Sequence, residues 1–251
     1  MPAKKKRTKA SDMGLWDPLP ESFIMDPDGD TVITLNNPSA PFEAGDNSAH
    51  DSLGSQPKTA TPRTFLVSSR HLVLASPVFK RMLAGAAWSE ASKVDGKFRI
   101  DSSEWDTQAF SIVLDLVHGR HRRTPKSVTL ETLSRIALIV NYYEFHEAVE
   151  ISCGSWVSKL VVSQPVPFEV QRNLYLWMFN AWVFGLEEIF KNTTKVAILR
   201  TTTDLETPDN LPIPLEIIGK PRQILLESQP NQSCHGLELG LELTISEPKI
   251  G

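Results

Sequence analysis

The 251-residue chain contains only two cysteines, Cys153 and Cys234. They lie far apart and no C-x2-C pair is present, so neither a disulfide framework nor a zinc site with paired thiolates is expected. No stretch reaches the roughly 18 consecutive apolar residues that a membrane-spanning helix needs, and no apolar run of the signal-peptide type follows Met1. We therefore expect a protein of the nucleus or cytoplasm that does not cross a membrane.

Other absences limit the function classes. The formal net charge is -4 and the pI is about 5.9, whereas a nucleic-acid-binding domain usually has a pI above about 9, so nucleic acid is not the expected partner. The chain has no G-x-G-x-x-G or G-x4-G-K-[ST] phosphate loop and no G-x-S-x-G nucleophile turn. No internal repeat is present. The sequence therefore predicts no catalytic residue, no metal site and no cofactor, and it does not indicate an enzyme.

One set of residues leaves an enzyme of unrecognised type as the least favoured alternative. It would require His118, His121, His146 and Cys153 to meet in one cleft, because metal or nucleophile chemistry needs side chains in direct contact. Cys153 falls on the apolar stripe of an expected helix, which favours a buried core thiol. The segment 118–126 also carries a basic cluster, a patch that could contact phosphate or an acidic partner surface, but without interleaved aromatic residues it does not indicate contact with nucleic acid.

The first 27 residues show neither helical nor strand periodicity, and we interpret them as a disordered basic tail. The residues Lys4, Lys5, Lys6 and Arg7 form a basic run in this tail, of the kind that an acidic import receptor recognises. Two interpretations are about equally open. The run is either a nuclear-import signal or a solvated stretch of charge without that role.

The richest pattern is the segment 63–83, whose two halves have different periods. Phe65 and Val67 lie two residues apart, as on one face of a strand. Apolar residues then recur at spacings of three and four, which is typical of a helix: Leu72, Ala75, Phe79 and Leu83. Ser76 and Pro77 predict a break between two short helices, because serine is a common N-cap and proline fits the first helical position. The segment is therefore a strand followed by a helical hairpin.

This segment resembles the core of the BTB/POZ domain, in the form common in filamentous fungi. The resemblance rests on a strand of the form Phe-x-Val, a leucine five residues later, an Ala-Ser-Pro-Val-Phe run, and an acidic residue before the preceding strand. In this chain the residues that carry it are Asp30, Phe65, Val67, Leu72, Ala75, Ser76, Pro77 and Phe79. Residues 97–101 resemble the third strand of that family and residues 110–119 its next helix.

The chain departs from the family pattern at two places. Ser68 stands where family members usually have a histidine directly after the strand. The first two strands, usually joined tightly, are separated here by residues 36–62, which we interpret as a disordered insertion because they offer little apolar surface to bury. Both departures fall in the region through which such domains often pair.

The second half of the chain predicts helices. Apolar stripes predict helices over 130–145 and 147–162, and one longer amphipathic segment runs from Leu174 to Phe190. Trp177, Trp182 and Phe184 in that segment are expected to be core residues rather than an exposed anchor. This part is similar to the C-terminal region of fungal BTB-containing proteins. Beyond Gly219 the pattern fades, which predicts a poorly ordered tail.

Together these observations predict an α+β protein with a small BTB/POZ-like sheet of about three strands surrounded by helices. The expected organisation is a disordered tail (1–27), a BTB/POZ-like domain (28–162), a helical extension (168–219) and a poorly ordered end (220–251). The resemblance implies a protein–protein interaction module that oligomerises or recruits a partner. Expected partners are a second copy, another BTB protein, or a cullin, for which the chain would be a ubiquitin-ligase adaptor. The alternative is a nuclear, transcription-associated regulator.

Overall fold

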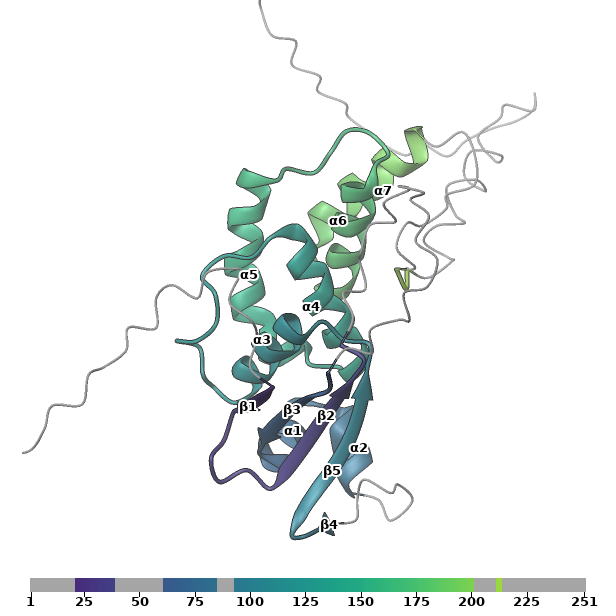
Figure 1. Ribbon diagram of the computed structural model, residues 1–251. Helices are drawn as coiled ribbons and strands as arrows, with labels where there is room; N and C mark the ends of the chain where they lie inside the picture. The colour runs from purple at the N-terminus through teal and green to yellow at the C-terminus, as the bar shows by residue number, and fades with distance from the viewer. Residues whose placement is uncertain (1–20, 39–60, 85–92, 201–210, 214–251) are drawn as a thin grey trace, which may run out of the picture.

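The computed structural model describes residues 21–38, 61–84, 93–200 and 211–213, and this part of the chain is α+β (Figure 1). The strands are β1 (Ser22–Ile24), β2 (Thr31–Asn36), β3 (Arg63–Val67), β4 (Lys93–Val94) and β5 (Lys97–Ser103). The helices are α1 (Ser69–Ala75), α2 (Pro77–Ala84), α3 (Thr107–Val117), α4 (Leu130–Tyr143), α5 (His146–Ser163), α6 (Arg172–Val183) and α7 (Glu187–Arg200). Figure 1 shows α1 and α2 behind the sheet, with α3 to α7 stacked above it in that view.

The strands form a mixed sheet in the order β1-β3-β2-β5-β4. β2 pairs antiparallel with β3 and parallel with β5, while β1 joins β3 in parallel. Burial alternates along the two central strands: Ile33, Leu35, Phe65 and Val67 are fully buried, whereas the residues between them are half-buried. This two-residue period follows from the pleat, which points successive side chains to opposite faces, so one face of the sheet carries the core.

The sheet corrects two sequence predictions. The described residues form five strands rather than about three, and residues 22–24, predicted to belong to a disordered tail, form β1. Arg120 explains the position of β1, because its Nη1 donates to the carbonyls of Ile24 at 2.6 Å and Met25 at 2.9 Å. A strand of three residues is too short to show a periodic pattern of apolar residues. Arg120, which holds it in place, lies almost 100 residues further along the chain. The basic run 4–7 and most of the insertion lie outside the described residues.

The strand and helical hairpin predicted for residues 63–83 are confirmed as β3, α1 and α2. Ser76 caps α2, since its Oγ accepts from the amide of Phe79 at 3.0 Å and donates to the carbonyl of Tyr143 at 2.5 Å. Pro77 occupies the first helical position, where its missing N–H costs no hydrogen bond. The buried Ser76 hydroxyl therefore starts one helix and also holds it against the end of another.

Asp30, the residue before β2, caps the other helix of the hairpin, α1. Its carboxylate accepts from the amide of Ser69 at 2.8 Å and from the hydroxyl of Ser69 at 2.7 Å, and Lys93 lies 3.7 Å away. Partial burial acts to raise the pKa of Asp30, but the hydrogen bonds from Ser69 and the charge of Lys93 outweigh it and hold that pKa below its usual value. Asp30 thus satisfies an otherwise unpaired amide at the start of α1.

The long amphipathic segment 174–190 was predicted as one helix, and this prediction is wrong. α6 ends at Val183, Gly185 adopts a left-handed φ of 64°, and α7 starts at Glu187. The amide of Leu186 donates back to the carbonyl of Ala181 at 2.9 Å, which closes the turn. Glycine adopts this conformation without the penalty that a Cβ would bring, so the chain reverses and the two helices pack as a hairpin.

The helical extension shares its core with the rest of the described chain. Leu176, Trp177 and Phe179 of α6 belong to the same buried cluster as the sheet residues. The indole of Trp177 is fully buried and donates to the carbonyl of Gln164 at 3.1 Å, while Trp182 and Phe184 are half-buried against the cluster. Trp177 is therefore a core residue as predicted, whereas Trp182 and Phe184 pack against the edge of the core. None of the helices in the described ranges is long and apolar enough to span a membrane.

Candidate interaction surfaces

A chain of aromatic rings connects the sheet to the end of α4. The Phe65 ring contacts Phe110 edge-on at a centroid distance of 5.1 Å, and Phe110 lies 6.3 Å from Tyr143. Tyr143 in turn stacks on Phe79 of α2 at 4.9 Å, and its hydroxyl lies 2.9 Å from Ser102 Oγ. Burial raises the pKa of Tyr143. This packing fixes the last turn of α4 with respect to both the sheet and the helical hairpin.

The residue before Tyr143 presents an aromatic ring to solvent. Tyr142 is 60% exposed, and its ring lies 5.3 Å from that of Trp105, which is half-buried in the connection between β5 and α3. We call these two residues the aromatic patch. Two residues after Tyr142, Glu144 pairs with Arg81 at 3.4 Å across an exposed surface. Tyrosine and tryptophan are enriched at protein interfaces, where a rigid ring supplies contact area at small entropic cost.

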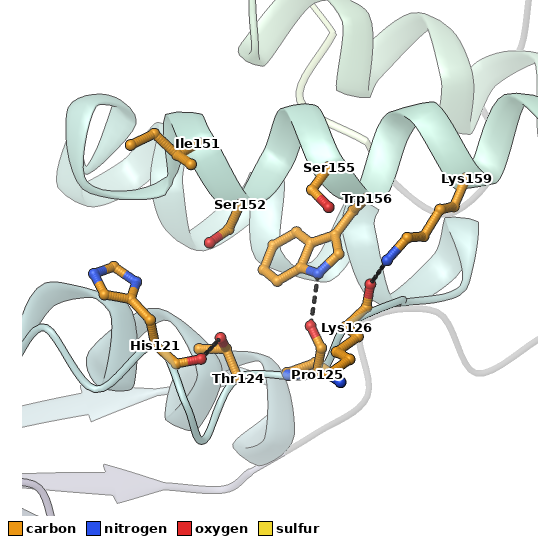
Figure 2. A pocket seen from close by; sticks show the side chains of 9 residues that line it. All are labelled: His121, Thr124, Pro125, Lys126, Ile151, Ser152, Ser155, Trp156 and Lys159. Carbon is orange, nitrogen blue, oxygen red and sulfur yellow. Dashed lines mark hydrogen bonds between the residues drawn. The ribbon is translucent and has the colours of Figure 1, made fainter.

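A groove of about 350 Å³ lies between the segment 121–126 and α5 (Figure 2). Its floor is the indole of Trp156, which is 2% exposed and donates to the carbonyl of Pro125 at 2.8 Å. The ammonium of Lys159 donates to the carbonyl of Lys126, so a second bond joins the helix to the segment. His121, Ile151 and Lys126 also line the groove. Hydrogen bonds therefore connect the two walls of the groove, the segment 121–126 and α5, without a ligand.

The histidines and the cysteine considered for catalysis or metal binding are not brought together. Within the described ranges, no group of three or more His, Cys, Asp or Glu side chains is placed to hold a metal ion. Cys153 is buried on α5, and burial raises its pKa to about 12, so the thiolate that nucleophilic chemistry needs is strongly disfavoured. The interpretation of Cys153 as a core residue is confirmed.

His118 has a structural role at the junction of β3, α1 and α3. Its Nδ1 lies 2.8 Å from the carbonyl of Leu114 and its Nε2 lies 3.0 Å from the amide of Ser68. A carbonyl can only accept and an amide N–H can only donate, so the ring is neutral with its proton on Nδ1. Burial lowers the pKa of His118, and the adjacent His71, whose ring is stacked at 5.0 Å, acts in the same direction. The Leu114 carbonyl and Asp26 oppose this shift.

We expect the free energy of unfolding to fall as the pH drops below 6.5, the ordinary pKa of histidine. Above that value His118 is neutral in both the folded and unfolded chains, so its contribution is fully present. Below it the unfolded chain binds a proton that the folded chain resists, and stability is lost until the pH passes below the lowered pKa of the folded state. Urea unfolding between about pH 8 and pH 5 measures this loss. His118→Gln should show a smaller loss, and equal pH dependence in both proteins would exclude this role.

The sequence alone does not predict the aromatic patch. Tyr142 lies in α4, which carries apolar residues on most of its faces. The spacing of apolar residues therefore does not predict that Tyr142 is exposed. The groove joins Pro125 and Trp156, which lie 31 residues apart. The basic cluster at 118–126 was the one sign of the groove in the sequence, where it predicts a patch able to contact phosphate or an acidic partner surface.

The described residues define an α+β protein with two surfaces suited to contact with other molecules. A scan against protein-family models matches no family, and a search of the curated proteins finds no match.

Proposed function

We propose that the chain is a protein–protein interaction module of the BTB/POZ type. The order of elements supports this proposal, because a strand, a helical hairpin, a further strand and then helices follow one another as the resemblance implies. The residues that carry the resemblance lie at the centre of the structure, where Phe65, Val67, Leu72 and Phe79 are buried. Asp30 and Ser76 cap the two helices of the hairpin. Ala75 and Pro77 lie at their junction.

The aromatic patch is the observation that carries the proposal. Tyr142 is held in position by the buried Tyr143 beside it, yet 60% of its side chain remains exposed next to Trp105. An aromatic pair with one exposed and one half-buried ring has the composition of a binding hot spot, in which Trp and Tyr are enriched. The patch therefore supports recruitment of a protein partner, which would be a cullin if the chain is a ubiquitin-ligase adaptor.

Self-association would use a different feature. β1 is the last strand at one side of the sheet, and Ile24 in it is 56% exposed. An edge strand can pair its outer backbone groups with another chain, and within the described residues only the Ile24 carbonyl of the outer row of β1 has a partner, Arg120. A second copy of this chain or another BTB protein is therefore the expected partner at this edge.

Affinity purification of the full chain, followed by mass spectrometry, should recover a cullin or another BTB protein. Tyr142→Ala should lose the partner that uses the aromatic patch, while leaving stability within about 1 kcal/mol because the side chain is largely exposed. Phe168→Ala is the matched control, since it removes an aromatic side chain that is 83% exposed at a different place. If no retained protein distinguishes the two variants and the chain sediments as a monomer at all concentrations, the proposal fails.

A nuclear, transcription-associated regulator is the second candidate function, and the basic run of Lys4, Lys5, Lys6 and Arg7 favours it. The nucleus and the cytoplasm remain the two expected locations. Deleting residues 1–9 from a fluorescently tagged chain should shift it from the nucleus to the cytoplasm. Unchanged nuclear signal after the deletion would remove the basis of this candidate.

A further inference from the structure

The groove between the segment 121–126 and α5 is basic, although the chain as a whole is acidic. Its lining includes Lys126, Lys159 and His121 and contains no carboxylate. Neither lysine forms an ion pair within the described part of the chain, whereas the nearby Arg120 and Arg123 both lie against Asp115. The formal net charge of the chain is -4. The groove therefore presents two available ammonium groups to a ligand.

The groove also offers apolar contact. Ile151 is 89% exposed on α5 and lines the groove (Figure 2). An exposed aliphatic side chain at this position offers apolar surface to a ligand. The volume of about 350 Å³ accommodates a few side chains and lies at the small end of the range for ligand sites.

The walls need little rearrangement to receive a ligand. Trp156 and Lys159 bond to backbone carbonyls of the opposite wall. Thr124 Oγ1 donates to the carbonyl of His121 at 2.7 Å, which braces the turn that carries the histidine. Lys159 uses one of its three N–H donors in this way, so the remaining donors are available to a carboxylate. A preorganised site loses less conformational entropy on binding.

We propose that this groove binds an acidic peptide segment of a partner protein. An apolar side chain of the segment packs against Ile151, and flanking carboxylates pair with Lys126 and Lys159. This surface shares no residue with the aromatic patch, so its role does not depend on the patch. Nucleic acid fits less well, because single strands are held by bases stacked on exposed rings, and the ring of Trp156 is buried.

The test uses the full chain labelled with ¹⁵N and a peptide probe in which one leucine is flanked on each side by two glutamates. Titration should give saturable shifts of the Trp156 indole signal and of the Lys126 and Lys159 amides, with a Kd below about 1 mM. A peptide with glutamine in place of glutamate should bind about fivefold to tenfold more weakly. Ile151→Asp should abolish binding, and it cannot disturb the core because the side chain is exposed.

Lys159→Glu should also abolish binding, whereas Lys191→Glu on α7 makes the same charge change outside the groove and should leave Kd unchanged. Three results would overturn the proposal: no saturable shift, equal affinity for the glutamate and glutamine peptides, or shifts that map outside the groove. Tighter binding of a ten-nucleotide thymidine strand, lost in Ile151→Asp and Lys159→Glu, would replace the acidic peptide by nucleic acid.

Discussion

Replacing Phe79 by alanine is expected to lower the free energy of unfolding by about 3–5 kcal/mol. The Phe79 side chain is 1% exposed, and its ring stacks on Tyr143 at 4.9 Å and on Phe145 at 5.7 Å. Alanine would leave a cavity where α2 meets the end of α4. The surrounding residues belong to elements that hydrogen bonds hold to one another, so they can collapse only partly into the space.

Urea unfolding followed by tryptophan fluorescence measures this loss. Lys80→Ala is the matched control on the same helix, and it should change stability by less than about 0.5 kcal/mol because the side chain is exposed. If Phe79→Ala does not fold, Phe79→Leu retains most of the volume and should give a smaller, measurable loss. A change below about 1 kcal/mol in Phe79→Ala would show that the ring is not a core residue.

Trp177→Ala is expected to destabilise the protein by a similar amount, about 3–5 kcal/mol. The side chain is fully buried, and its Nε1 donates to the carbonyl of Gln164 at 3.1 Å. The substitution therefore removes a large apolar surface and leaves the Gln164 carbonyl without this donor. Because Trp177 and the sheet residues share one buried cluster, the loss should appear in the unfolding of the whole domain.

Two probes distinguish a shared core from a separate subdomain. Hydrogen exchange of α6 amides and of β3 amides should accelerate together in Trp177→Ala, as expected when both report one cooperative unit. Leu199→Ala on α7 is the control, since this side chain is 66% exposed. Faster exchange in α6 with unchanged exchange in β3 would show that the extension unfolds independently.

Local patterns predicted the part of the fold that local chemistry determines. The change of period at residues 63–83 and the Ser76-Pro77 pair specify a strand, a break and two helices within about twenty residues. Gly119 follows the end of α3 with a left-handed φ of 66°, a conformation that glycine adopts at helix C-termini. These features need no knowledge of distant residues, because caps and periodicity act within one or two turns.

Long-range contacts explain the failures. β1 depends on pairing with β3 and on the side chain of Arg120, neither of which leaves a pattern near residue 22. Gly185 interrupts a stretch whose apolar spacing continues on both sides, and a single glycine is often tolerated within a helix, so periodicity could not reveal the turn. The groove and the aromatic patch likewise depend on which residues the fold leaves exposed, which spacing along the chain does not determine.

The aromatic patch is proposed to bind a protein partner. The most direct test is the Kd of the purified full chain for the partner recovered by affinity purification, measured by calorimetry for the wild type, Tyr142→Ala and Phe168→Ala. The proposal predicts binding about tenfold or more weaker for Tyr142→Ala, as for a hot-spot residue, and wild-type affinity for Phe168→Ala. Equal affinities in all three proteins, or no direct binding by the wild type, would contradict it.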